Sequence, residues 1–360
     1  MKLNLRNILL GILMMIGSSV YAASVTDSLA FFKASEAVIQ YTGRIDFSNP
    51  NLPRFWQPGV YIKIGFKGPY CQLHINDEVL YGSSHNYITI VVDNGKPQRM
   101  QLKEKSNVIK VAENLSEGEH TVLICKDTEA NIGYIEFAGI NCLELTALPD
   151  KPKHLIEYIG DSITCGTGAD VSEVPCGKGA WHDQHNAYLA YGPITARALN
   201  AQWHLSSVSG IGLMHSCCDM NIIMPQVFDK VSMRDNKIKW DFKNYQPDVV
   251  SVCLGQNDGI QDATAFCNNY IAFVKLLRVY YPKATIVCIS SPMADEKLRN
   301  FQKEQLSAVV SALKASGFKD IYMHCFEKSY NAGCDWHPSL AEHQVIAAEL
   351  TDFLKKIMKW

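Results

Sequence analysis

Residues 155–168 read Leu-Ile-Glu-Tyr-Ile-Gly-Asp-Ser-Ile-Thr-Cys-Gly-Thr-Gly, an apolar run that ends on a serine among small residues. Such a run predicts a strand that is buried on both faces. A parallel strand delivers its last residues to the carboxyl edge of the sheet, where open α/β folds place their chemistry. Ser162 is therefore a candidate nucleophile, and the alternative is that Gly160-Asp161-Ser162 forms an ordinary turn.

The chain after Ser162 alternates apolar segments with amphipathic ones. We expect strands at 155–159, 203–208, 248–254, 284–290 and 320–325, and helices near 186–200, 219–228, 262–280, 295–316 and 339–357. Strands that alternate with helices are the signature of a parallel sheet with helices on both faces. Residues 155–360 are thus predicted to form an α/β domain.

The chain before residue 147 has another pattern, of short segments separated by turn signals such as Asp93-Asn94-Gly95. Strands are expected at 60–66, 70–75, 87–92, 107–111, 120–126 and 132–145. Short strands at close spacing favour an antiparallel sandwich or jelly roll. A polar stretch with two prolines lies at 147–153. We therefore predict an all-β jelly-roll domain at 24–148, a linker at 149–154 and the α/β domain at 155–360.

Residues 1–23 are predicted to be a cleaved secretory signal. Lys2 and Arg6 precede an apolar run at 8–16, and a segment rich in small residues follows at 17–23. A retained membrane anchor is the alternative, but the run is shorter than the ~20 residues that a membrane span needs. We expect the mature protein in an oxidising compartment, either secreted or periplasmic.

An oxidising compartment makes disulfides available to the twelve cysteines. Those in apolar strand-like runs are expected to be buried free thiols, namely Cys125, Cys253, Cys288 and Cys325. Those in predicted loops are candidates for disulfides, namely Cys165, Cys176, Cys217, Cys218 and Cys334. No Cys-x-x-Cys pair occurs, which argues against a structural zinc site.

A formal net charge of −2 gives no sign of a nucleic-acid partner or of an anionic membrane surface. The segment Gly210-Ile211-Gly212 lacks the third glycine of a dinucleotide fingerprint. We expect no cofactor, no nucleic-acid partner, no membrane in the mature form, and a monomer.

Three further groups follow other strands of the predicted sheet and so belong at the same edge as Ser162. Gly210 follows the second strand, Asn257 follows the third, and His337 precedes the last helix. A serine, an imidazole and hydrogen-bond donors are what acyl transfer requires. We assign Ser162 as nucleophile and His337 as general base. The N–H groups of Ser162 and Gly210 and the Asn257 amide are assigned as the oxyanion hole.

Residues 181–185 read Trp-His-Asp-Gln-His, and this cluster raises a metal site as an alternative. A bound cation needs at least three protein ligands, and beyond Asp183 no further ligand is evident. We expect no metal and interpret the stretch as a loop at the mouth of the site, where Trp181 and His182 contact substrate. Trp336, beside His337, is interpreted as a stacking platform for sugar, and the alternative is a core residue.

The C-terminal two thirds of the chain resembles the SGNH (GDSL-like) hydrolase superfamily. The four blocks of that superfamily match Gly160-Asp161-Ser162, Gly210, Gly255-Gln256-Asn257-Asp258 and Asp335-Trp336-His337-Pro338. Segments 191–197 and 209–213, after a front sandwich, look more narrowly like carbohydrate esterase family 2.

This resemblance implies a secreted bacterial enzyme that removes O-acetyl groups from plant polysaccharides such as xylan or glucomannan through an acetyl-enzyme. The expected partner is an acetylated carbohydrate. A lipase or thioesterase of the same superfamily and a non-catalytic carbohydrate-binding protein are the alternatives.

One position departs from the superfamily pattern. The aspartate that usually lies three residues before the histidine is replaced by Cys334, and Asp335 lies two residues before His337. In an extended loop a carboxylate at that offset points to the other side of the backbone. Some members of carbohydrate esterase family 2 work with a serine–histidine dyad whose imidazole is held by a backbone carbonyl. We expect this arrangement here, with Asp335 as a third triad member as the alternative.

Overall fold

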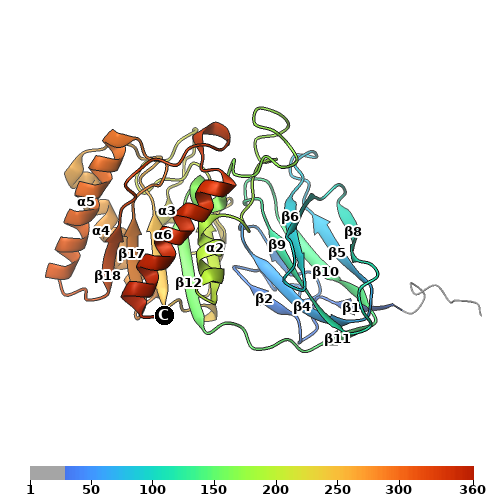
Figure 1. Ribbon diagram of the computed structural model, residues 1–360. Helices are drawn as coiled ribbons and strands as arrows, with labels where there is room; N and C mark the ends of the chain where they lie inside the picture. The colour runs from blue at the N-terminus through green and yellow to red at the C-terminus, as the bar shows by residue number, and fades with distance from the viewer. Residues whose placement is uncertain (1–28) are drawn as a thin grey trace, which may run out of the picture.

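The computed structural model describes residues 29–360, so the predicted signal segment lies outside the described residues. An all-β unit is followed along the chain by an α/β unit, and the two lie side by side (Figure 1). Within residues 29–360, no helix is long and apolar enough to cross a membrane.

Two antiparallel sheets form the N-terminal sandwich. One has the order β1-β10-β5-β8 with β3 beside β10, and the other has the order β11-β4-β9-β6-β7 with β2 beside β4. The strands are β1 (Ala30–Lys33), β2 (Gln40–Thr42), β3 (Arg54–Phe55), β4 (Tyr61–Lys67), β5 (Cys71–Asp77), β6 (Tyr87–Val92), β7 (Gln98–Gln101), β8 (Ser106–Ala112), β9 (Glu119–Lys126), β10 (Ile135–Cys142) and β11 (Glu144–Thr146). Strands β1, β2, β3 and β7 were not predicted, because a strand of two to four residues shows too little alternation to be recognised.

The α/β unit is built on five parallel strands in the order β13-β12-β16-β17-β18. The strands are β12 (His154–Gly160), β13 (Ala201–Ser207), β16 (Val249–Cys253), β17 (Thr285–Ile289) and β18 (Ile321–His324). The strand order reverses at β12, and open α/β sheets bind ligands at the carboxyl ends of the strands beside such a reversal. The fold therefore favours a site at the end of β12.

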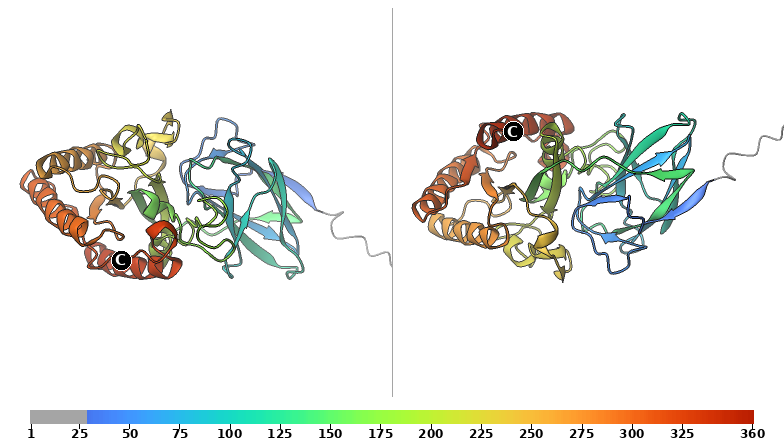
Figure 2. Two further views of the ribbon diagram at one scale, coloured as in Figure 1. Left: turned by 90° about the horizontal axis from the view of Figure 1, so that it is seen from above. Right: turned by 90° about the horizontal axis from the view of Figure 1, so that it is seen from below.

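Helices cover both faces of this sheet (Figure 2). The helices are α2 (Tyr191–Ala198), α4 (Ala263–Tyr280), α5 (Glu296–Ala315) and α6 (Leu340–Met358). Successive side chains of β12 face opposite cores: Ile159 packs with residues of α4 and α5, and Tyr158 packs with residues of α2 and α6. This alternation explains why the strand is apolar along nearly its whole length.

The predicted helix at 219–228 is wrong for most of its length. Only α3 (Met224–Val227) is helical there. Cys217 and Cys218 are joined by a disulfide, and Cys218 and Asp219 adopt positive φ angles of 60° and 57°, which a helix cannot accommodate. A short hairpin of β14 (Lys230–Ser232) and β15 (Lys237–Lys239) follows, which the sequence did not predict.

Two disulfides are present in the described residues, Cys176–Cys334 and Cys217–Cys218. The prediction for Cys165 is wrong, since it is a buried free thiol 3.2 Å from Ser207 Oγ. The short helical turn that carries Cys165 directs its side chain into the core, where it forms no disulfide. Cys125, Cys253 and Cys288 are buried free thiols as predicted, and Cys325 is free but partly exposed.

The two units share a buried interface. Tyr61 of β4 stacks on Trp203 of β13 with ring centroids 4.1 Å apart. Arg44 forms an ion pair with Glu157 of β12 at 2.8 Å, and both side chains are buried. Glu157 lies on the strand that ends two residues before Ser162, so the sandwich directly contacts the strand that leads to the candidate site.

Candidate active site

Ser162 begins a single turn of helix, α1 (Ser162–Cys165), directly after β12. Asp161 caps this turn by accepting a hydrogen bond from the Ile163 N–H at 3.1 Å. Position 160 requires a glycine, because a Cβ there would lie 2.1 Å from Thr164 Oγ1. The tight connection between strand and helix places the serine at the carboxyl edge of the sheet, as the sequence predicted.

His337 lies between a 3-10 turn, η3 (Cys334–Trp336), and helix α6. Its Nε2 is 2.8 Å from Ser162 Oγ, although the two residues are 175 positions apart. Its Nδ1 donates to the Cys334 carbonyl oxygen at 3.3 Å. With the Nδ1 proton held by that carbonyl, Nε2 can accept the hydroxyl proton of the serine.

Asp335 does not orient the imidazole. Its side chain is exposed, and its backbone lies in the left-handed region with φ 51°. No hydrogen bond joins its carboxylate to His337 in the part of the chain that the structure describes. A backbone carbonyl therefore stands where a triad would place a carboxylate.

The environment of His337 favours its neutral form. Burial lowers the pKa of His337 below the ordinary value, while hydrogen bonds to the backbone of Cys334 and Asp335 and the negative charge of Asp335 oppose this lowering. A neutral imidazole is the form that can take a proton as a general base.

Asn257 lies between the turn that holds Ser162 and the turn that holds Gly210. Its Nδ2 donates to the Ile211 carbonyl at 2.9 Å and to Asp161 Oδ2 at 3.2 Å. The N–H group of Ser162 is at the start of α1, where no intrahelical acceptor exists. The structure thus brings the three predicted oxyanion-hole groups to the same edge of the sheet.

A glutamate of the sandwich hydrogen-bonds to the backbone of the turn that contains Gly210. Glu129, between β9 and β10, accepts the N–H of Ser209 at 2.6 Å. Ser209 Oγ in turn lies 2.9 Å from Thr167 Oγ1, in the segment after Ser162. Glu129 is fully buried, and burial raises its pKa. Glu129 was not among the predicted site residues, because the polar stretch Asp127-Thr128-Glu129 after the predicted strand 120–126 is typical of an exposed loop, whereas all three residues are buried.

The predicted mouth residues divide into buried and exposed ones. His182 is 5% exposed, whereas Trp181 is 47% and Trp336 76% exposed, so Trp336 is not a core residue. The Trp181 ring meets the His185 ring edge-on with centroids 4.5 Å apart, and His185 Nε2 is 3.3 Å from Thr167 Oγ1. Within residues 29–360, no three His, Cys, Asp or Glu side chains are gathered as a metal site would require.

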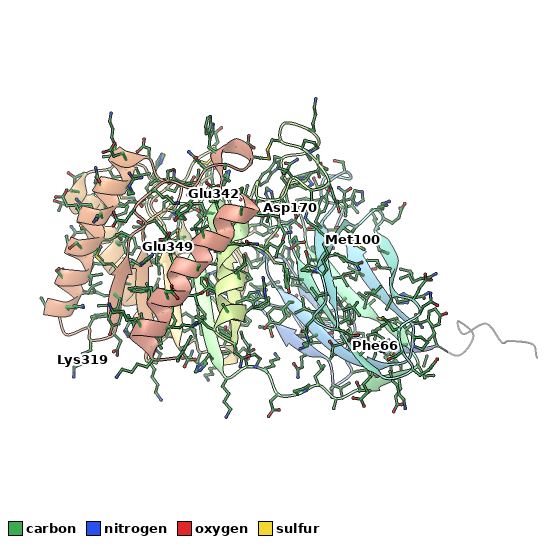
Figure 3. All side chains as sticks on the ribbon, viewed as in Figure 1. Phe66, Met100, Asp170, Lys319, Glu342 and Glu349 are labelled. Atoms are coloured by element: carbon green, nitrogen blue, oxygen red, sulfur yellow. A yellow bond between two sulfur atoms is a disulfide. The ribbon has the colours of Figure 1, made fainter. Side chains whose placement is uncertain are left out.

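Asp170 and Glu342, which follow Ser162 and His337 in the chain, are labelled in the upper part of Figure 3, whereas Lys319 is labelled at the lower edge of the α/β unit. The carboxyl ends of the parallel strands therefore carry the whole candidate site.

Two family models match the chain. The one described as carbohydrate esterase 2 N-terminal matches residues 41–152, and the GDSL-like lipase/acylhydrolase family matches residues 158–345. The cellulase/esterase CelE of Acetivibrio thermocellus is 32% identical over 337 residues, which are 89% of this chain but only 40% of CelE. An acetylxylan esterase/glucomannan deacetylase of Cellvibrio japonicus is 28% identical over 371 residues, 98% of this chain and 99% of that protein.

Solved structures agree with the sequence matches. A family two carbohydrate esterase from Clostridium thermocellum in complex with cellohexaose has a TM-score of 0.82 at 30% identity, covering 89% of this chain and 99% of that chain. The chain belongs to the GDSL-like lipase/acylhydrolase family and, within it, to carbohydrate esterase family 2.

Proposed function

We propose that this protein removes O-acetyl groups from plant polysaccharides of the xylan or glucomannan type, through an acetyl-enzyme on Ser162. The observation that carries the proposal is the 2.8 Å contact between Ser162 Oγ and His337 Nε2 at the end of β12. Membership of carbohydrate esterase family 2 and the similarity to an acetylxylan esterase/glucomannan deacetylase support the substrate class.

Acylation starts when His337 Nε2 takes the hydroxyl proton and Ser162 Oγ attacks the carbonyl carbon of the acetyl group. The oxyanion that forms is stabilised by the oxyanion-hole groups assigned above. Each such donor contributes about 2.7–4 kcal/mol to lowering the barrier. The imidazolium then gives its proton to the departing sugar oxygen, and the acetyl group stays on the serine.

Deacylation repeats these steps with water. His337 Nε2 takes a proton from the water as its oxygen attacks the acetyl carbonyl, and the imidazolium returns the proton to Ser162 Oγ. Acetate leaves and the serine hydroxyl is restored. The neutral imidazole required at the start of each step is the form that burial of His337 favours.

The Asn257 amide gives one of its two hydrogens to Asp161. This contact, at 3.2 Å to Asp161 Oδ2, is longer than the one of 2.9 Å to the Ile211 carbonyl. We propose that the charged oxyanion that develops during the reaction takes over the hydrogen that the amide gives to Asp161.

Trp181 and Trp336 are proposed to hold the sugar chain. Their exposed rings lie on two loops that the Cys176–Cys334 disulfide joins. Aromatic side chains with one exposed face are common in contacts with ligands that have an apolar face. The related esterase from Clostridium thermocellum was solved in complex with cellohexaose, which supports a site for a chain of sugars.

Acetate release tests the proposal. The wild type is assayed on acetylated xylan, acetylated glucomannan, para-nitrophenyl acetate and para-nitrophenyl palmitate, beside Ser162→Ala and the control Ser83→Ala in an exposed turn of the sandwich. We expect acetate from the first three substrates with wild type and Ser83→Ala, and none with Ser162→Ala. Retained activity in Ser162→Ala, or hydrolysis of the palmitate ester alone, would contradict the proposal.

We also propose that residues 1–23 are removed on export to an oxidising compartment. The Cys176–Cys334 disulfide supports this, because such bonds persist mainly outside reducing cytosol. Intact-mass analysis of the exported protein should give a chain that begins near residue 24. A chain that retains Met1 would contradict it.

A further inference from the structure

We infer that the disulfide between Cys176 and Cys334 positions the His337 imidazole for catalysis, in place of the carboxylate that the superfamily usually carries three residues before the histidine. The inference rests on the proposed Ser162–His337 dyad and names what orients its base. Cys176 and Cys334 are thus positioning residues, whose effect on the reaction passes through His337.

The disulfide fixes the residue whose carbonyl holds the imidazole. It joins two segments 158 residues apart. Cys334 also donates its N–H to the Gly168 carbonyl at 2.8 Å, while its own carbonyl accepts from His337 Nδ1. With its side chain and its N–H both held, Cys334 can present its carbonyl oxygen in only one direction.

The turn after Cys334 needs such a restraint, because its backbone is strained. Asp335 and Trp336 both lie in the left-handed region, with φ of 51° and 61°. Residues other than glycine stay in this region only where the surroundings determine the conformation. Both of these side chains are exposed, so their own packing does not supply that restraint. Backbone hydrogen bonds close the turn, from the Gly333 N–H to the His337 carbonyl at 2.7 Å and from the His337 N–H to the Cys334 carbonyl at 3.0 Å. The covalent bond to Cys176 adds a restraint from a distant loop.

The strained turn packs directly against the segment that carries the serine. A Cβ on Gly168 would lie 2.6 Å from the Cys334 carbonyl oxygen and 3.3 Å from His337 Cβ. Any movement of Cys334 therefore moves the imidazole relative to Ser162. A displacement of about 1 Å at a catalytic group costs on the order of a hundredfold in rate.

The first test removes the bond by substitution. The double variant Cys176→Ser/Cys334→Ser is compared with wild type on para-nitrophenyl acetate, a small ester that reports on the chemistry rather than on glycan binding. We expect kcat to fall by roughly ten- to a hundredfold while KM changes by less than about threefold. The control Cys267→Ser, which removes a free thiol of α4, should match wild type.

The second test does not depend on how the variant folds. Wild type is reduced after folding: dithiothreitol passes two electrons and two protons to the sulfurs of the disulfide and closes into its own cyclic disulfide. Cys176 is exposed to solvent, so the reductant can reach the disulfide. We expect kcat to fall to the level of the double variant and to recover after reoxidation with oxidised glutathione. Treating the double variant in the same way measures the separate effect of reducing Cys217–Cys218.

A spectroscopic readout separates positioning from a general structural role. The proton on His337 Nδ1 should give a protected NMR signal in oxidised wild type, and this signal should be lost on reduction while circular dichroism stays unchanged. If the folded double variant or the reduced wild type keeps kcat within about twofold of wild type, the inference is overturned. A wild type that hydrolyses no acetyl ester would instead overturn the proposed function.

Discussion

The two nitrogens of the His337 imidazole have different partners. Nε2 faces Ser162 Oγ at 2.8 Å, and Nδ1 donates to the Cys334 carbonyl at 3.3 Å. A carbonyl can fix the tautomer and the ring orientation, but it stabilises the imidazolium less than a carboxylate does, because it carries no net charge. Two expectations at the scale of single residues follow from this difference.

Asp335→Asn should change kcat on para-nitrophenyl acetate by less than about threefold, whereas His337→Ala should lower it by about 10⁴-fold or more. The reason is that the exposed Asp335 carboxylate makes no hydrogen bond to the imidazole in the described residues. Steady-state kinetics of the two variants beside wild type decide the point. Losses of similar size in both variants would restore Asp335 as a triad member.

The pH dependence of kcat/KM should also show whether a carbonyl or a carboxylate is the partner of His337 Nδ1. The neutral imidazole is the active base, and burial lowers the pKa of His337 below its ordinary value of 6.5. Activity is therefore retained as the pH falls to 6.5 and is lost only when it falls through the lowered pKa. Titration of kcat/KM on para-nitrophenyl acetate from neutral into acidic buffer measures this limb. Burial raises the pKa of Asp161 to about 7, so the titration is repeated with Asp161→Asn. A limb above 6.5 that persists in this variant would indicate a carboxylate beside the ring.

At the scale of elements, the site is assembled from tight turns at strand ends. The segment after α1 and the η3 turn meet at Gly168, which has φ +67°. The absence of a side chain there lets the Cys334 carbonyl approach closely. The geometry of the dyad therefore depends on a contact between two backbones.

Gly168→Ala should lower kcat by about tenfold or more, because its methyl group would collide with the Cys334 carbonyl and displace His337. Gly82→Ala is a matched control: Gly82, in an exposed turn of the sandwich, has φ +76°, but a Cβ there would meet no atom within 4 Å. Both variants carry a similar backbone strain of about 1–2 kcal/mol, so only the collision differs. Equal kcat values for the two variants would show that the contact does not position the imidazole.

At the scale of the whole molecule, the sandwich is part of the structure that supports the site. Glu129 of the sandwich accepts the Ser209 N–H beside Gly210 at 2.6 Å, and Arg44 pairs with Glu157 on the central strand. Both contacts cross the interface between the two units. Through them the sandwich supports the turn beside Gly210, a proposed oxyanion-hole residue, and the strand that leads to Ser162.

Glu129→Ala should lower kcat on para-nitrophenyl acetate by about tenfold with little change in KM, because the Ser209 N–H loses its acceptor and the Gly210 turn loosens. Glu129→Gln keeps a carbonyl oxygen for the same N–H and should retain most of the activity. Kinetics of both variants, with thermal unfolding to confirm folding, make the measurement. An alanine variant as active as the glutamine variant would show that Glu129 does not support the Gly210 turn during catalysis.

The sequence could predict those parts of the molecule that depend on local patterns. Apolar runs located all five parallel strands, and the order of Ser162, Asn257 and His337 after successive strands brought them to one edge. It could not predict contacts that depend on packing between distant segments. Burial of Glu129, the pairing of Cys176 with Cys334 and the free state of Cys165 are decided by which surfaces meet across the fold.

The central claim is that Ser162 carries the acetyl group during turnover. Wild type mixed with para-nitrophenyl acetate is quenched within the first turnover and analysed by intact-mass and peptide mass spectrometry, beside Ser162→Ala. We predict one added acetyl group on the peptide that contains Ser162 in wild type and none in the variant. Turnover by wild type without acetylation of Ser162, or an acetylated and active Ser162→Ala variant, would contradict the account.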